Sequence, residues 1–291
     1  KLLPINAANL HSGIFTENQN HNKNMDVAKD YLKINKEAWN KKTPVHFESD
    51  FYNNSAFIAG ATSLKDIELP LLGDVSGKKI LHLQCHFGQD SISLARMGAD
   101  VTGVDLSDIS IQKANELVEK TGVECRFIEC DIYSLPEVLD EKFDIVFSTY
   151  GTIGWLPDLD KWSHIVSHFL KPGGRLIFAE FHPVVWMFDD EFAGVGYNYF
   201  NDGAIHEQQE GTYTNPEADI DQEYVMWNHG LAEVISNLIN NGMVLSQFHE
   251  FDYSPYNCFN YTEEFELGKF RIKHFENNIP MVYSLEAHKP G

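Results

Sequence analysis

The chain has 291 residues, of which 43% are hydrophobic and 13% aromatic, so it is long and apolar enough to bury a substantial core. Forty-three acidic residues against 22 basic ones give a formal net charge of −21, and the resulting field argues against nucleic acid and anionic membrane surfaces as partners. The four cysteines form no CxxC pair, and neither a signal-peptide pattern nor an apolar run of about 18 residues is present, so we expect a reducing, cytoplasmic setting.

The first residues are interpreted as a polar tail. Its core, NQNHNKN at 18–24, is too rich in Asn and too poor in apolar residues to pack on its own, so we expect it to be loosely ordered. Met25 follows directly, and residues 1–24 could therefore precede the natural start of the protein.

An amphipathic helix is predicted next, beginning at Asp26 and breaking by Pro44. Its apolar positions are Val27, Tyr31, Ile34 and Ala38. An aromatic-rich arm continues toward the first strand. We interpret residues 1–74 as a tail followed by this arm, ahead of a main domain over 75–291.

The central part of the chain alternates strand and helix, which is typical of right-handed parallel crossovers and predicts a doubly wound α/β sheet. The expected strands lie at about 79–84, 100–105, 124–129, 143–148 and 175–180. The expected helices lie at about 89–97, 108–120 and 160–170. Ser107 or Asp108 can cap the second of these helices. The turn at 171–174, KPGG, is expected to stop the third helix and to admit the fifth strand.

After the fifth strand the alternation stops. Residues 184–226 are rich in aromatics, Asp and Gly, and period-two stretches on either side of NPEAD predict a hairpin, so we interpret this segment as an insertion that covers a site. A helix pattern returns at 228–241. Strands at 243–251 and 281–289 would complete a seven-stranded sheet.

The stretch KILHLQCHFGQDSISL at 79–94 predicts a buried strand, a tight loop ending in Gly88 and a helix, and the second strand ends in Asp105. In a doubly wound sheet this puts a backbone-lined crevice beside a carboxylate, where a nucleoside-bearing cofactor lies and its ribose hydroxyls need an acceptor. These two features alone do not decide which nucleoside, because a glycine-bearing loop also opens dehydrogenase domains.

An ordered set of motifs is more specific. The first loop and Asp105 are followed by CDIYSLP, FDIVFSTY and LKPGGRLIFAE in the order and spacing of one family. Over roughly residues 75–290 the chain resembles class I S-adenosylmethionine-dependent methyltransferases, and within them the small bacterial type 11/12-like subgroup with an LHLQCHFG-style first loop. The resemblance implies a Rossmann-like sheet of order 3-2-1-4-5-7-6 with the last strand antiparallel. It also implies in-line SN2 transfer of a methyl group to an N, O or S atom of a small-molecule acceptor, without a metal and with S-adenosylhomocysteine as product.

The resemblance implies that the segment before the first strand, within residues 1–74, folds over the cofactor as a lid. The residues that it assigns to the cofactor lie in this lid and at the carboxyl ends of strands one to four. They are Trp39, Gln84, Cys85, His86, Gly88, Asp105, Leu106, Ser107, Asp131, Ile132, Thr149 and Tyr150. The first loop would pass beneath the methionine end, and Asp105 would accept hydrogen bonds from the ribose hydroxyls. Leu106 would pack on the adenine ring, while Asp131 and the backbone of Ile132 would bond its edge. Asp131 has an alternative interpretation as the cap of a local turn.

The first loop departs from the family pattern acidic-x-Gly-x-Gly-x-Gly. His82, Gln84 and His86 stand where the acidic residue and the first two glycines would be, and glycine there permits positive φ. Either Gln84 and His86 adopt ordinary backbone angles with their side chains turned away, or they crowd the pocket. Crowding would favour a non-catalytic protein that binds an adenosyl ligand. A nicotinamide-dependent oxidoreductase is a further alternative, although it has no use for KPGG.

Catalytic candidates follow from the chemistry. A sulfonium methyl is already reactive, so a base is needed only when the acceptor must lose a proton. His182, after strand five, and His46, in the lid, are the candidate bases, with Tyr52 as an orienting hydrogen-bond donor. His164 and His168 have the spacing of a metal-binding pair but no evident third ligand, so no metal site is expected.

Overall fold

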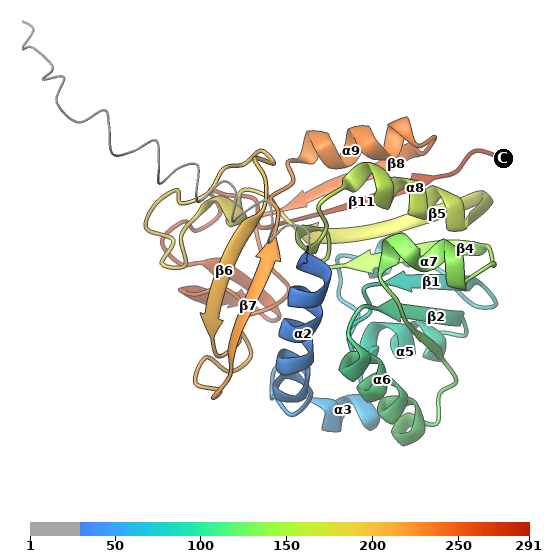
Figure 1. Ribbon diagram of the computed structural model, residues 1–291, viewed down its shortest axis with the longest axis horizontal. Coiled ribbons are helices and arrows are strands. Elements are labelled where there is room, and N and C mark those ends of the chain that lie inside the picture. The colour runs from blue at the N-terminus through green and yellow to red at the C-terminus, as the bar shows by residue number, and fades with distance from the viewer. Residues whose placement is uncertain (1–29) are drawn as a thin grey trace, which may run out of the picture.

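The computed structural model describes residues 30–291 (Figure 1). The polar tail, Met25 and the first turn of the helix expected from Asp26 lie outside these residues. Within them no helix has both the length and the apolar character needed to cross a bilayer.

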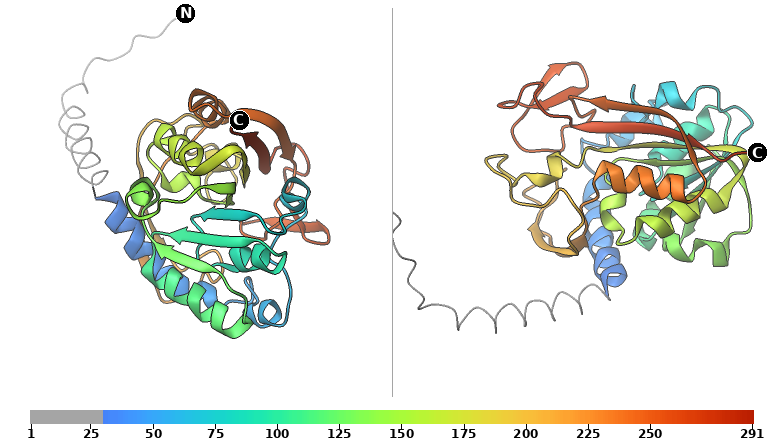
Figure 2. Two further views of the ribbon diagram at one scale, coloured as in Figure 1. Left: turned by 90° about the vertical axis from the view of Figure 1, so that its right-hand side faces the viewer. Right: turned by 90° about the horizontal axis from the view of Figure 1, so that it is seen from above.

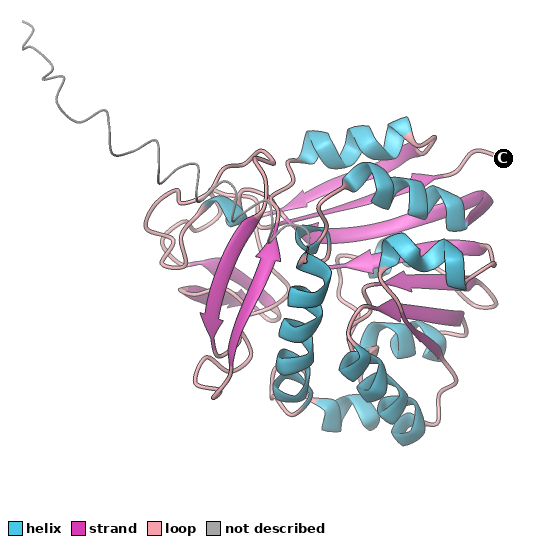
Figure 3. Ribbon diagram, in the orientation of Figure 1, coloured by secondary structure: helices cyan, strands magenta, loops and turns pink. Residues whose placement is uncertain are grey.

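A seven-stranded sheet of order β3-β2-β1-β4-β5-β11-β8 forms the centre of the molecule (Figure 3). Its strands are β1 (Lys79–Leu83), β2 (Asp100–Asp105), β3 (Arg126–Glu129), β4 (Phe143–Thr149), β5 (Leu170–Phe181), β8 (Val244–Phe251) and β11 (Val282–His288). β1 to β5 run parallel, and β11 is antiparallel to both β5 and β8. The predicted fold class and strand order are therefore confirmed.

Helices cover both faces of the sheet. They are α3 (Asn54–Ile58), α4 (Leu69–Leu72), α5 (Gln89–Arg96), α6 (Asp108–Thr121), α7 (Leu135–Val138), α8 (Leu159–Phe169) and α9 (Leu231–Asn240). β1 shows how one strand supports two layers, because successive side chains point to opposite faces. Ile80 packs in a core cluster with Leu94 of α5, whereas Leu81 belongs to a cluster with Phe169 of α8.

Helix α2 (Tyr31–Phe47) does not break at Pro44, so that prediction was wrong. Proline removes one backbone donor but does not prevent a helix that other contacts hold. Here the Thr43 hydroxyl lies 2.8 Å from that of Ser110 on α6, and the Asn35 amide exchanges two 2.8 Å hydrogen bonds with the backbone of Val225. These contacts outweigh the preference of the residue before Pro44 for an extended backbone.

β5 begins five residues earlier than expected. α8 ends at Phe169, as the helix stop at KPGG predicted, but the strand starts at Leu170 and takes in the KPGG segment. The reason is long-range pairing: the Gly173 N–H donates to the Lys289 carbonyl (2.9 Å), and the Lys289 N–H donates to the Gly174 carbonyl (2.8 Å).

Two small hairpins stand beyond the carboxyl ends of the parallel strands. The predicted hairpin around NPEAD is β6 (Ile205–Glu210) with β7 (Asp221–Met226). A second hairpin, β9 (Thr262–Glu266) with β10 (Lys269–Ile272), was not predicted. α2 lies across the carboxyl ends of the strands, between the sheet and β6–β7, as Figure 1 and the right panel of Figure 2 show.

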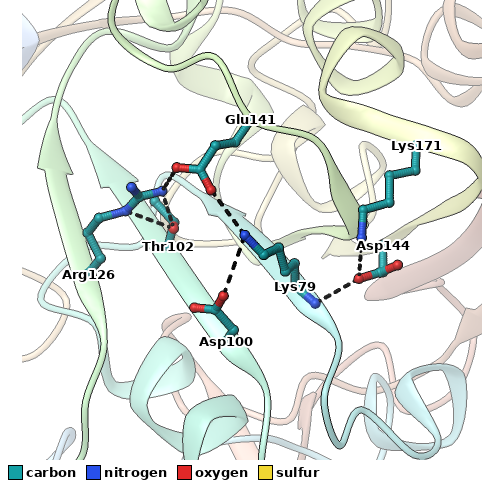
Figure 4. Close-up of polar contacts among 7 residues, drawn as sticks. All are labelled: Lys79, Asp100, Thr102, Arg126, Glu141, Asp144 and Lys171. Carbon is teal, nitrogen blue, oxygen red and sulfur yellow. Dashed lines mark hydrogen bonds and ion pairs between the residues drawn. The ribbon is translucent and has the colours of Figure 1, made fainter.

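The opposite, amino edge of the sheet carries a network of ion pairs (Figure 4). Lys79 approaches Glu141 (3.3 Å) and Asp100 (3.8 Å), and Arg126 pairs with Glu141 (2.8 Å). Lys171 pairs with Asp144 at 2.9 Å. This edge is therefore closed by side chains that satisfy one another.

Candidate active site

A cavity of about 770 Å³ lies at the carboxyl edge of the sheet. The loops after β1, β2, β4 and β5 form its floor, and α2, the β6–β7 segment and the chain after β8 form its other walls. Aromatic residues on these walls include Trp39, Phe51, Tyr52, Tyr150, Trp155, Trp186, Tyr213, Tyr224, Tyr256 and Phe259. The volume lies within the range of roughly 300–1,000 Å³ that is usual for small-molecule sites.

The loop after β1 has a glycine-like backbone without the glycines. Gln84 has φ of 55° and His86 has φ of 50°, beside Gly88 at 80°. Of the two alternatives, ordinary backbone angles are therefore wrong, and the non-glycine residues carry the strain that glycine would avoid. The Gln84 side chain donates to the Thr152 carbonyl (2.8 Å), which ties this loop to the one after β4.

Gly88 is required by packing as well as by its φ. A Cβ at this position would come within 2.4 Å of the Phe127 ring. Cys85, also in the loop, is buried at 4% exposure, and burial raises the pKa of its thiol well above the usual value. The thiol is accordingly a packed group and not a nucleophile.

Asp105 ends β2 and lines the cavity. One carboxylate oxygen accepts from the His86 backbone N–H (2.8 Å) and the other from the Ser107 N–H (2.9 Å). Burial raises the pKa of Asp105 to about 6, although these backbone hydrogen bonds oppose the rise. Each oxygen retains acceptor capacity, so the carboxylate can accept further hydrogen bonds from a ligand.

The next candidates divide between the cavity wall and the scaffold. Leu106, Asp131 and Ile132 line the cavity. Asp131 also caps the short helix η1 (Ile132–Ser134), accepting from the Ser134 N–H. Ser107 does not line the cavity: it caps α6 by accepting from the Ser110 N–H (3.0 Å) and donates to Asn40 (2.6 Å).

The loop after β4 is held by one buried carboxylate. Glu180 of β5 accepts hydrogen bonds from the backbone N–H groups of Gly151, Thr152, Ile153 and Phe181. Burial raises the pKa of this carboxyl. The loop it fixes includes Tyr150 and Gly151, both with positive φ (47° and 71°). Glu180 thus shapes the floor between β4 and β5.

Two carboxyl groups that the sequence analysis missed lie beside Thr149 and Tyr150. The Thr149 hydroxyl donates to Asp90 (3.1 Å), and the Tyr150 hydroxyl donates to Glu68 (2.7 Å). Asp90 lines the cavity, whereas Glu68 is fully buried behind Tyr150. Burial, and secondly the charge of Asp90, raise the pKa of Glu68 to about 8.

Comparison with known proteins decides the family. A family profile described as "Methyltransferase domain" matches residues 74–233, more than half of the chain. The chain belongs to this methyltransferase family. The uncharacterized methyltransferase YbaJ of Bacillus subtilis is 25% identical over 235 residues, which are 74% of this chain and 89% of that protein. The cofactor of the family is S-adenosylmethionine, as the resemblance implied.

Other relatives match only in part. The ubiquinone biosynthesis O-methyltransferase of Photorhabdus laumondii is 33% identical over 107 residues, 37% of this chain and 44% of that protein. This match therefore spans less than half the length of that relative.

Solved structures show the same fold. A SAM-dependent methyltransferase from Methanosarcina mazei aligns with a TM-score of 0.55 and 19% identity, covering 77% of this chain and 99% of that one. One from Mesorhizobium loti aligns with a TM-score of 0.51 and 18% identity, covering 80% and 100%.

The cavity of this methyltransferase fits that cofactor on two observations. Asp105 keeps acceptor capacity for ribose hydroxyls. The volume of the cavity leaves room for a second small molecule beside a nucleoside. Among residues 30–291 no group of three His, Cys, Asp or Glu side chains is arranged to hold a metal.

The candidate bases of the methyltransferase do not line the cavity. The His46 ring is fully buried behind His86, with 3.1 Å between Nδ1 of His46 and Nε2 of His86, and burial lowers the pKa of His46 to about 2. His182 Nε2 lies 3.0 Å from Glu250 of β8, and His182 is not part of the cavity lining. Tyr52 does line the cavity, and its hydroxyl lies 2.6 Å from that of Tyr213.

Proposed function

We propose that the protein is an S-adenosylmethionine-dependent methyltransferase acting on an N, O or S atom of a small, enclosed acceptor. The observation that carries this proposal is the cavity at the carboxyl edge, where the Asp105 carboxylate faces an opening bounded by the loops after β1 and β4. When bound, the cofactor supplies an electrophilic methyl group that an acceptor atom can displace in line.

The residues of the chain bind the cofactor, orient the acceptor and surround both. Asp105 would hold the ribose hydroxyls, and Asp131 with Ile132 the adenine edge. Glu180 keeps the loop after β4 in one conformation, so the cavity wall beside Tyr150 is preorganised. This loop therefore loses little conformational entropy when a ligand binds. Helix α2 and the aromatic residues of the other walls line the cavity, so bound substrates would displace water from it.

A histidine base is left out of the proposal because neither His46 nor His182 lines the cavity. Tyr52 remains in it as a hydrogen-bond donor that orients the acceptor. A small acceptor is supported by the cavity volume of about 770 Å³, and the relative named for ubiquinone biosynthesis is consistent with it. A cytoplasmic setting is part of the proposal, supported by the absence of disulfides among Cys85, Cys125, Cys130 and Cys258.

The test is a calorimetric titration with S-adenosylhomocysteine. Asp105→Ala should weaken binding by more than tenfold, because the ribose hydroxyls lose their charged acceptor. Asp100→Ala is the matched control, since Asp100 begins the same strand at the opposite edge. Equal affinities for Asp105→Ala and wild type would refute the assignment of the cofactor site.

One alternative shares the binding of the cofactor but omits the transfer of the methyl group. A non-catalytic adenosyl-binding protein would also bind S-adenosylhomocysteine, and the strained Gln84 and His86 suit either role. Transfer of label from methyl-labelled cofactor to the small-molecule fraction of a cell extract separates the two. Binding without any labelled product would favour the non-catalytic protein.

A further inference from the structure

Lys42, on the inner side of α2, is a buried cation without a charged partner. It is 4% exposed and lines the cavity. Among residues 30–291 no carboxylate lies within 4.0 Å of its ammonium, and no hydrogen-bond acceptor is found for it. A buried ammonium has three donors to satisfy, and leaving a buried charge unpaired is costly.

Three aromatic rings surround the ammonium but do not replace an acceptor. Nζ lies 4.6 Å from the ring centroid of Tyr224, 5.3 Å from that of Trp155 and 5.4 Å from that of Trp39. Cation–π contacts of this kind attract a positive charge from the ring faces, yet they leave its N–H groups without lone pairs. Burial lowers the pKa of Lys42 to about 8.

The other lysines of α2 are partnered. Lys36 pairs with Glu129 and Asp108, and Lys33 lies 3.9 Å from Glu37. Lys41, next to Lys42 in sequence, is exposed and donates to the Asp221 carbonyl at 2.7 Å. The unpartnered state of Lys42 is therefore a feature of its position at the cavity and not of the helix as a whole.

We propose that Lys42 is the counter-ion of a carboxylate on a molecule bound in the cavity. This inference rests on the proposed function, which brings two sources of a carboxylate to the site: the amino-acid end of the cofactor, or the acceptor itself. The ammonium lies near the loop after β1, because Nζ is 5.4 Å from the ring centroid of Trp39 and the His86 ring of that loop is centred 5.1 Å from the same centroid. That loop is the one expected beneath the methionine end of the cofactor.

The first arm of the test compares two nucleosides by calorimetry. S-adenosylhomocysteine carries the amino-acid carboxylate, and 5′-methylthioadenosine has the same adenosine and thioether without it. If Lys42 pairs with the cofactor, Lys42→Met should weaken binding of S-adenosylhomocysteine by more than tenfold and leave 5′-methylthioadenosine unchanged. Lys42→Arg should restore part of the loss, and Lys41→Met should behave as wild type.

The second arm addresses the acceptor. Protein saturated with S-adenosylhomocysteine is titrated with phenylacetate and with the neutral phenethyl alcohol. If the acceptor supplies the carboxylate, wild type should bind phenylacetate more tightly than phenethyl alcohol. Lys42→Met should lose this preference and keep its affinity for S-adenosylhomocysteine.

An independent readout is the titration of Lys42 itself. Carbon-13 NMR of the lysine Cε, assigned by its loss in Lys42→Met, should show the pKa of Lys42 rising when the carboxylate-bearing ligand binds.

The outcomes separate this inference from the proposed function. If wild type binds neither nucleoside, the proposed function fails and takes the inference with it. If wild type binds both, and Lys42→Met changes neither the affinity for S-adenosylhomocysteine nor the response to phenylacetate, the counter-ion role alone is refuted.

Discussion

The two edges of the central sheet handle charge in opposite ways. At the amino edge, Lys79, Arg126 and Lys171 keep side-chain exposures of 45%, 48% and 40% and pair with carboxylates (Figure 4). At the carboxyl edge, Glu180 and Lys42 are buried, and neither pairs with an opposite charge among residues 30–291. Glu180 accepts hydrogen bonds from backbone N–H groups, whereas Lys42 lines the cavity and has no protein acceptor among the same residues. Partly exposed pairs contribute little free energy, so the charges that matter for function and folding lie at the carboxyl edge.

The largest expected effect comes from removing the Glu180 carboxylate. Glu180→Ala leaves the N–H groups of Gly151, Thr152, Ile153 and Phe181 without an acceptor in a buried loop. Each orphaned donor costs about 1–3 kcal/mol, partly recovered by relaxation, so the free energy of unfolding should fall by about 3–5 kcal/mol. Urea denaturation at pH 7 measures this loss.

Glu180→Gln is the matched control for that experiment. It keeps the size of the side chain and one acceptor oxygen, so its loss of unfolding free energy should be smaller than that of Glu180→Ala. Equal and small losses, below about 1 kcal/mol, would show that the loop does not depend on the carboxylate.

A pH-dependent effect of a few kcal/mol is expected at Glu68. Its pKa is raised from 4.5 to about 8 in the folded protein, first by burial and then by Asp90. Between these values the unfolded chain releases the proton and the folded protein keeps it, so the contribution of Glu68 to stability is present below about pH 4.5 and is lost as pH rises to 8. Glu68→Gln cannot ionise and should gain on wild type by a few kcal/mol across this window.

The measurement for Glu68 is the unfolding free energy of wild type and Glu68→Gln at pH 5 and pH 9. Groups that do not interact with Glu68 titrate alike in the two proteins, so the difference between their unfolding free energies reports on Glu68 and the groups beside it. Curves that stay parallel over the whole range would mean that Glu68 ionises normally in the folded protein.

Most of the sheet could be predicted from sequence, and the failures have a common cause. The alternation from β1 to β5 is visible because apolar runs are separated by helix-ending glycines such as Gly98 and Gly122. Pro44 misled the prediction because the contacts that keep α2 helical come from Ser110 and Val225, far away in sequence. β9 was missed because most of its residues are exposed, and no burial pattern marks it.

Site residues could be predicted where a sequence motif marks them, and they were missed where only the fold brings them to the site. Asp105 could be named because it ends a predicted strand beside a loop. Glu68 could not, because the hydrogen bond that brings it to Tyr150 spans 82 residues. Lys42 had one weak signal, its place one helical turn after Trp39, but its burial depends on Trp155 and Tyr224 from distant segments.

A smaller effect, with a pH dependence opposite to that of Glu68→Gln, is expected for Lys42→Met in the ligand-free protein. Its pKa is lowered from 10.5 to about 8 by burial. At pH 7 both states carry the charge and the folded state bears its desolvation, so Lys42→Met should stabilise the protein by about 1–3 kcal/mol. As pH rises from 8 to 10.5 the folded state sheds the proton first, wild type recovers, and the advantage of the variant should disappear.

Urea denaturation of both ligand-free proteins at pH 7 and pH 10 tests this prediction, with Lys41→Met as the exposed control. A destabilised Lys42→Met at pH 7 would mean that the ammonium is already compensated without a ligand. Lys42 would then no longer be an example of an uncompensated buried charge at the carboxyl edge.

The smallest effect is expected at the amino edge. Lys79→Met removes ion pairs to Asp100 and Glu141 but leaves the backbone hydrogen bond from Lys79 to Asp144 in place. Since these pairs are partly exposed, the free energy of unfolding should change by less than about 1 kcal/mol, and the change should shrink further in roughly 1 M salt. A loss of unfolding free energy as large as that of Glu180→Ala, and unaffected by salt, would show that the ion pairs at the amino edge stabilise the fold strongly. Burial would then no longer explain why the two edges differ.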